Sequence, residues 1–140
     1  MTSQNLKNLL KTGLLKPEPG DQKEFNGLLH SARARLADAH KQSLSMESRF
    51  DLAYNAAHAL SLAALRWHGY RSEKRYAVFQ CVPHTLGLGP EVWRVLMLCH
   101  ERRNLAEYEG DLEIDEQLVA DLLNAADGLA EGVAALGPIK

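Results

Sequence analysis

Polar side chains capable of chemistry are concentrated after the apolar run of residues 92–99. The residues that follow directly are His100, Glu101, Arg102, Arg103 and Asn104. Because an α-helix has 3.6 residues per turn, His100, Asn104 and Tyr108 would lie on one stripe. Arg103 and Glu107 would form the neighbouring stripe. One helical surface would therefore gather an imidazole, an amide, a phenol and a guanidinium.

These groups suit a nucleotide or an RNA backbone. The planar fork of Arg103, with Arg102 beside it, matches a phosphate, and His100 can move protons near neutral pH. Asn104 and Tyr108 can orient a ribose or a base through hydrogen bonds. The sequence thus predicts an RNA- or nucleotide-binding surface formed by these five residues.

A purely structural interpretation of the same residues stays open. Arg103 would then pair with Glu107 at an ordinary helix end, while Asn104 and Tyr108 would hydrogen-bond to a neighbouring helix.

A second basic cluster lies at residues 66–76. Its members are Arg66, Arg71, Lys74 and Arg75, with His68, Tyr70 and Tyr76 interleaved. Such a cluster can contact phosphate and stack bases, or it can be only a solvated helix end. The charge of the chain is also uneven, with 13 Lys and Arg against 8 Asp and Glu in residues 1–100, and 3 against 10 in residues 101–140.

The composition indicates one helical domain. A chain of 140 residues with 46% apolar and 24% charged residues is neither a disordered tail, a collagen-like repeat nor a disulfide-stapled miniprotein. Aromatic residues are few, while Ala and Leu favour helices. The apolar stretches are much shorter than the roughly 20 residues of a membrane helix, and the N-terminus lacks a secretory pattern. We expect a soluble, cytoplasmic, all-α protein without membrane association.

Apolar periodicity predicts an up-and-down bundle of about five helices. A short leading helix and a Pro/Gly hinge account for residues 1–20, and the bundle fills residues 21–140. The expected helices of the bundle span about 21–40, 46–67, 73–84, 90–108 and 115–136. The helix over 46–67 is apolar around most of its circumference, so it should form the centre of the bundle or part of a subunit interface.

Motifs for metal and cofactor chemistry are missing from the sequence. It contains no Gly-rich phosphate loop, no His-Glu-x-x-His, no Cys-x-x-Cys and no nucleophile elbow. The six histidines have no pair at ligand spacing, and Cys81 and Cys99 lie in apolar contexts as expected of buried thiols. We therefore expect neither a metal nor a cofactor.

The whole pattern resembles the HEPN superfamily, the small helical bundles of prokaryotic toxin–antitoxin pairs and RNA-processing systems. The resemblance covers roughly residues 5–136. It rests on the segments at residues 9–19, 49–57 and 69–71, on Arg103-Asn104 and on Tyr108-Glu109-Gly110. The chain most resembles a bacterial subgroup of this superfamily, in which the penultimate helix ends in the motif Arg-Asn-x-x-x-Tyr.

The resemblance implies a homodimer. Catalytic HEPN proteins carry an Arg followed four to six residues later by His, and two copies cut RNA without a metal. By this resemblance, Arg103 corresponds to the Arg of the motif, and Asn104 corresponds to the polar residue that often follows it. The position of the His is occupied approximately by Tyr108. A tyrosine with a pKa near 10 is a poor general base at neutral pH.

Three functions follow as hypotheses. The first is a non-catalytic HEPN-like homodimer that binds RNA or a nucleotide, or that pairs with a nucleotidyltransferase able to modify Tyr108. The second is a metal-independent endoribonuclease that uses Arg103 with His100 or Tyr108. The third is a structural or scaffolding bundle, in which the alanine-rich helix over 46–67 would be the functional surface.

Overall fold

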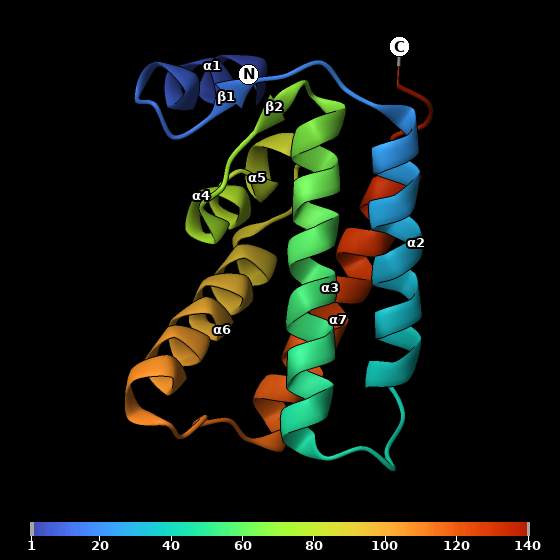
Figure 1. The fold of residues 1–140 in the computed structure, drawn as a ribbon, viewed down its shortest axis with the longest axis vertical. Coiled ribbons are helices and arrows are strands. Elements are labelled where there is room, and N and C mark those ends of the chain that lie inside the picture. Colours follow the sequence, from blue (N-terminus) through green and yellow to red (C-terminus); the bar gives the residue numbers. More distant parts are fainter. Residues whose placement is uncertain (1, 140) are drawn as a thin grey trace.

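A computed structural model describes residues 2–139 and shows a chain that is 71% helical (Figure 1). Within these residues the structure has seven helices and two short paired strands. The helices are α1 (Thr2–Lys11), α2 (Gln22–Ala39), α3 (Met46–Trp67), α4 (Arg75–Gln80), α5 (Val82–Thr85), α6 (Pro90–Glu109) and α7 (Glu116–Ala134), and the strands are β1 (Lys16–Pro17) and β2 (Tyr70–Arg71).

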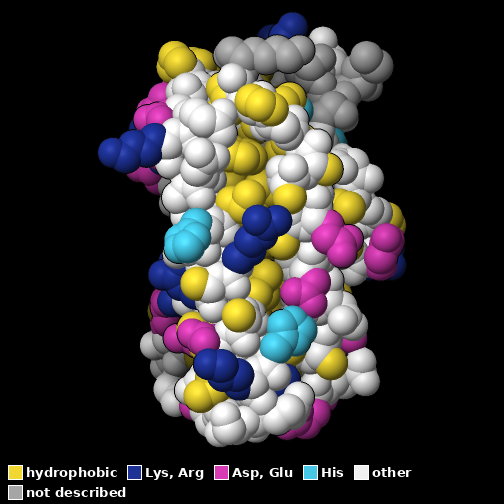
Figure 2. Space-filling model, turned by 90° about the vertical axis from the view of Figure 1, so that its right-hand side faces the viewer, with side chains coloured by type: hydrophobic (Ala, Val, Ile, Leu, Met, Phe, Trp, Pro, Cys, Tyr) yellow, Lys and Arg dark blue, Asp and Glu magenta, His cyan; other side chains and the backbone are white. Residues whose placement is uncertain are grey.

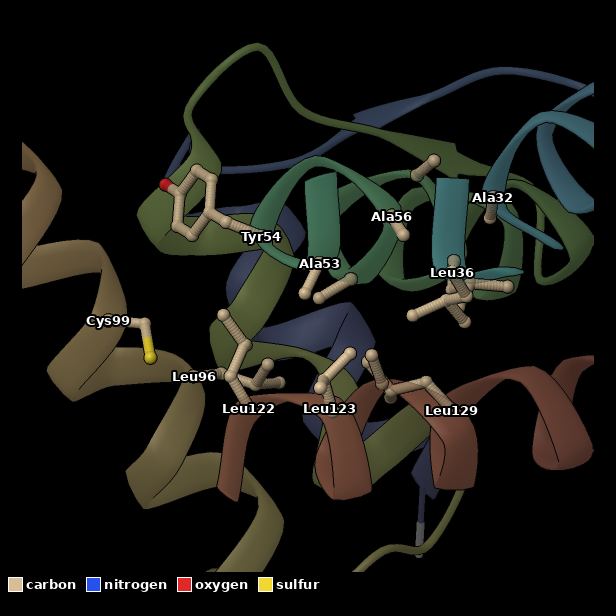
Figure 3. Packing of buried hydrophobic residues seen from close by; sticks show 14 of the residues in the cluster. Ala32, Leu36, Ala53, Tyr54, Ala56, Leu96, Cys99, Leu122, Leu123 and Leu129 are labelled. Atoms are coloured by element: carbon tan, nitrogen blue, oxygen red, sulfur yellow. The ribbon is translucent and has the colours of Figure 1, made fainter. Parts of the chain in front are cut away.

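The centre of the fold is α3, which packs most extensively against α2 and α7. Small side chains on α3, among them Ala53 and Ala56, are fully buried and let Leu36 of α2 and Leu122 of α7 approach (Figure 3). The helix over 46–67 thus forms the centre of the bundle, as expected. Its alanine-rich surface lies inside the protomer, so the prediction that this surface could serve as an external functional face is wrong.

Local capping sets the ends of the long helices. The side chain of Asp21 accepts hydrogen bonds from the backbone amides of Lys23 and Glu24 at 2.9 and 3.3 Å. Ser45 caps α3, and Asp115 caps α7 by accepting from the amide of Leu118 at 2.8 Å. These caps satisfy amides that have no partner within the helix, which explains why the observed boundaries lie close to the predicted ones.

The helix expected over residues 73–84 is two short helices. Ser72 accepts a hydrogen bond from the amide of Lys74 at 3.3 Å, and Lys74 is the capping position of α4. The chain breaks at Cys81, between α4 and α5. Pro83 has no N–H to donate to the carbonyl of Phe79, so a continuous helix would lose a hydrogen bond there. The division raises the bundle from the expected five helices to six, and α1, the expected leading helix, brings the described residues to seven.

Residues 2–20 form more than a helix and a hinge, because they also pair and pack with the bundle. Lys16 pairs with Arg71 and Pro17 with Tyr70 in an antiparallel register, so the fold is not purely helical. In α1, Leu6 packs with Leu65 and Val78 in a small second core, to which Leu15 and Cys81 also belong.

A buried arginine holds this N-terminal segment in place. Arg66 is only 2% exposed, and its Nε donates to Glu24 at 2.7 Å. Its two Nη atoms donate to the carbonyls of Glu18 and Pro19 at 2.8 and 2.7 Å. Arg71 forms ion pairs with the same two glutamates. Two members of the basic cluster of residues 66–76 are therefore engaged within the fold.

The side of the molecule on which α2 lies carries a strip of hydrophobic side chains flanked by charged residues and histidines (Figure 2). Half-buried residues of α2 and α7, among them Leu29 and Ala130, pack against the core. No helix within residues 2–139 is long and apolar enough to span a membrane.

Candidate functional site

Helix α6 carries the residues that the sequence singles out. Leu96 and Cys99 are buried against the core, but Leu98 is 39% exposed and Arg94 is exposed. The apolar run of residues 92–99 is therefore buried only in part. Figure 1 shows α6 inclined away from α3 toward its C-terminal end, which leaves its last turns open to solvent.

His100 is the centre of a hydrogen-bonded line between two helices. Its Nδ1 lies 3.0 Å from the hydroxyl of Tyr54 on α3, and its Nε2 lies 3.1 Å from Nδ2 of Asn104. Because the amide donates to Nε2, Nδ1 of the neutral ring carries the proton and donates to the Tyr54 oxygen. Both nitrogens of His100 are thus engaged.

Two arginines lie against the ring of Tyr54, which is itself 1% exposed. The guanidinium carbon of Arg103 is 5.2 Å from the ring centroid, and that of Arg75 is 5.5 Å away. Both distances are within the range of cation–π attraction. Nη1 of Arg103 also donates to Glu107 at 3.1 Å. Nη1 of Arg75 is buried and has no hydrogen-bond partner among residues 2–139.

The electrostatics of this cluster keep its imidazoles neutral. Burial, followed by the charges of Arg75, His100 and Arg103, lowers the pKa of His58 to about 4. Burial and then the same two arginines also lower the pKa of His100. Burial raises the pKa of the Tyr54 phenol, and Arg75 opposes that shift. Near pH 7 the permanent positive charges of the cluster therefore belong to the two arginines.

An open groove of about 560 Å³ runs along the other side of His100. Its lining includes Tyr76, Trp93, Met97, His100, Asn104 and Tyr108. Nε1 of Trp93 is buried without a hydrogen-bond partner among the residues that the structure describes. Aromatic and apolar walls with a few polar groups are typical of sites that bind small organic ligands or bases.

The predicted site residues occupy three environments. His100, Asn104 and Tyr108 line the groove, although Tyr108 is 90% exposed at its edge. Arg103 contacts Tyr54 and Glu107, so the expected pairing of Arg103 with Glu107 is present. Arg102 lies elsewhere, with its Nη1 3.5 Å from Glu113.

Sequence reasoning missed Tyr54 and His58, and it named Arg75 without placing it beside them. Tyr54 and His58 come from the apolar helix α3, where they resemble ordinary core side chains. Arg75 comes from the basic cluster of residues 66–76, whose other arginines, Arg66 and Arg71, face Glu18 and Glu24 instead. The sequence shows Arg75 as a charged residue next to Tyr76. This position does not indicate which helix the Arg75 side chain contacts.

Metal and thiol chemistry receive no support from the described residues. Among residues 2–139, no group of three His, Cys, Asp or Glu side chains is arranged to hold a metal ion. Burial raises the pKa of Cys81 and of Cys99 to about 12, so both thiols are protonated and unreactive at neutral pH.

The arrangement can bind an anion beside an aromatic groove. Two guanidinium groups from different helices approach one buried ring, and His100, which is hydrogen-bonded to that ring's hydroxyl, lines the groove. Comparisons with protein-family models, with curated proteins and with solved structures find no match to this chain.

Proposed function

We propose that this chain is a non-catalytic, HEPN-like module that forms a homodimer and binds RNA or a nucleotide at the C-terminal half of α6. The observation that carries the proposal is the position of Arg103. Its guanidinium is held against Tyr54 next to the hydrogen-bonded line of Tyr54, His100 and Asn104, and that line borders the aromatic groove. Phosphate binding by Arg103 and base stacking in the groove would be simultaneous.

Binding is better supported than cleavage. A general base needs a nitrogen or oxygen free to take a proton from the ribose hydroxyl. Both nitrogens of His100 are hydrogen-bonded, and Tyr54 is buried with a raised pKa. Tyr108 lies two turns beyond His100 and is almost fully exposed. A metal-independent endoribonuclease therefore remains the alternative that the binding experiment must exclude.

The proposed homodimer would use exposed apolar side chains of α6. Leu98 and Leu105 are 39 and 40% exposed, and both line the groove. Burial of such side chains against a second copy would be favourable. We expect Leu105→Glu to give a folded monomer in analytical ultracentrifugation where the wild type is a dimer. An unchanged sedimentation coefficient would remove this face from consideration.

A nucleotidyltransferase is the protein partner that the HEPN resemblance suggests. Tyr108 would be the acceptor of its modification, and the 90% exposure of this side chain is compatible with access by another enzyme. A scaffolding role remains the outcome if neither RNA nor a nucleotide binds.

The test is a mobility shift with end-labelled structured RNA in EDTA, using wild type, Arg103→Ala and Arg33→Ala. Arg33 is an exposed arginine on α2 and serves as the matched control. We expect binding that Arg103→Ala weakens by about tenfold, as for loss of a charge-assisted contact. RNA should stay intact in every lane. Cleavage that depends on Arg103 would overturn the non-catalytic assignment, and equal binding by all three proteins would overturn the site.

A further inference from the structure

We infer that Arg75 and Arg103 together form a binding site for a phosphate dianion at the junction of α3, α4 and α6, which receives the terminal phosphate of a nucleotide or of an RNA end. This inference rests on the proposed function for the nucleotide or RNA part of the ligand. It adds the ligand class, a phosphomonoester, and a binding residue, Arg75, that lies on a different helix from the residues described under the proposed function.

The first support is the convergence of two cations on one ring. Arg75 begins α4 and Arg103 lies in the penultimate turn of α6, yet both guanidinium carbons are within 5.5 Å of the Tyr54 centroid. Both arginines also contribute to the lowered pKa of His58 and His100, so the junction carries a positive potential that an anion would relieve. The Tyr54 ring that both groups approach is itself fixed, because it is buried and its hydroxyl is bonded to His100.

The second support is the free hydrogen-bonding capacity of Arg75. Its Nη1 is buried and has no acceptor among residues 2–139, whereas almost all buried polar atoms in proteins have one. Arg66 and Arg71 of the same basic cluster are fully paired with Glu18 and Glu24. Arg75 is thus the arginine of that cluster without a carboxylate partner among residues 2–139, and its contact within the fold is with Tyr54.

The third support is the charge of the groups that face this junction. Tyr54 and His58 come from α3, Arg75 from α4, and His100, Arg103 and Glu107 from α6. Glu107 contacts Arg103 from a position that is 63% exposed, and a second carboxylate of α6, Glu101, lines the groove. The lowered pKa of His58 is partly caused by both arginines, as expected of a positive potential. A dianion fits this potential better than a phosphodiester with one charge.

The groove on the other side of His100 explains why the phosphate should belong to a nucleotide. Tyr76 directly follows Arg75 in the chain and lines the groove, and its ring centroid is 6.2 Å from that of His100. His100 is the residue that the two places share, since it lines the groove and its pKa responds to both arginines, so we place the sugar or base of the ligand in the groove beside Tyr76, Trp93 and Asn104. These residues offer ring faces for stacking and an amide for hydrogen bonding.

The experiment has two arms, each with wild type, Arg75→Gln, Arg75→Lys and the control Arg33→Gln. In the first arm, NMR follows the ring signals of His58 and His100 during titration with inorganic phosphate, with chloride at matched ionic strength as the blank. The second arm measures affinity for one RNA sequence carrying a 5′-phosphate, a 3′-phosphate or hydroxyls at both ends. Circular dichroism verifies that each variant is folded.

We expect phosphate to raise the pKa of His58 and His100 in wild type and in Arg33→Gln, because a bound anion favours the charged imidazole. The effect should be lost in Arg75→Gln and weakened in Arg75→Lys, which keeps the charge without the planar fork. RNA with one of the terminal phosphates should bind wild type about tenfold more tightly than hydroxyl-ended RNA, and Arg75→Gln should abolish that preference.

The outcomes separate this inference from the proposed function. If the RNA affinity does not depend on the terminal phosphate and is the same in Arg75→Gln, the proposed function is kept and the phosphate site is overturned. A phosphate effect on His58 that requires Arg75, without binding of any RNA, would keep the site as one for a free phosphate or a small phosphomonoester and overturn the RNA assignment. If phosphate leaves the histidine pKa values unchanged and no RNA binds, both the phosphate site and the proposed function are overturned.

Discussion

The hydroxyl of Tyr54 on α3 lies 3.0 Å from Nδ1 of His100 on α6, and this is the polar contact that joins the core helix to the candidate site. The two residues are 46 positions apart in the sequence. Stacking of Tyr54 on Phe50 and its edge contact with Phe79 hold the ring in the core. The bond therefore fixes the orientation of the imidazole relative to the two arginines.

Replacement of Tyr54 by Phe removes this hydrogen bond and keeps the ring. We expect the free energy of unfolding to fall by about 1 kcal/mol, because the Nδ1–H of His100 loses its acceptor. Urea denaturation measures the change. Tyr76→Phe is the control, since Tyr76 is half exposed and its hydroxyl makes no hydrogen bond to the rest of residues 2–139. Equal losses in the two variants would contradict a specific role for the Tyr54 hydroxyl.

His58 should make the protein less stable in mild acid. Its pKa is lowered, first by burial, to about 4, whereas an unfolded chain has the ordinary value of 6.5. Between these values the unfolded state binds a proton that the folded state does not, so stability is complete above pH 6.5 and decreases as the pH falls toward 4. The loss amounts to at most about 3 kcal/mol. His100 contributes in the same direction.

Denaturation of wild type, His58→Gln and His30→Gln at several pH values between 7 and 4 tests this dependence. His30 is exposed on α2 and is the matched histidine. The decrease in stability toward acid should be smaller in His58→Gln and unchanged in His30→Gln. Parallel curves for all three proteins would show that His58 titrates normally in the folded state.

Arg66 should be essential for attachment of the N-terminal segment. Arg66→Met leaves Oε1 of Glu24 and the carbonyls of Glu18 and Pro19 without their donor, while Arg71 still pairs with the other oxygen of Glu24. Loss of one partner of a buried ion pair costs 3–5 kcal/mol, and the partial exposure of both glutamates reduces our expectation to roughly 2–3 kcal/mol. Thermal denaturation measures it. Glu73→Ala breaks the exposed 3.8 Å pair with Lys16 and should cost less than about 1 kcal/mol.

Ala57→Trp should unfold the protomer rather than only separate subunits. Ala57 is fully buried in α3 between neighbouring helices, and a large ring there overpacks the core by roughly 3 kcal/mol or more. Ala37→Trp on the exposed face of α2 is the control and should be tolerated. A folded Ala57→Trp protein with altered oligomeric state would instead place α3 at a subunit interface.

Much of the fold could be predicted because its causes are local. Apolar periodicity and the caps at Asp21, Ser45 and Asp115 define α2, α3 and α7 nearly to the residue. The division between α4 and α5 was missed because Val78, Phe79 and Val82 continue a helical pattern across it. The pairing of residues 16–17 with 70–71 was also missed, since two-residue strands have no periodicity of their own.

In the candidate site, too, the contacts within one helix could be predicted from the sequence, whereas the contacts between helices could not. By itself, the sequence determined that Arg103 faces Glu107 and that His100 faces Asn104, because residues four apart on one helix are neighbours. Only the tertiary structure decided that Tyr54 and Arg75 join them and that Arg102 does not. Helical periodicity states which residues share a face, whereas the packing of the whole core selects the helix that each face meets.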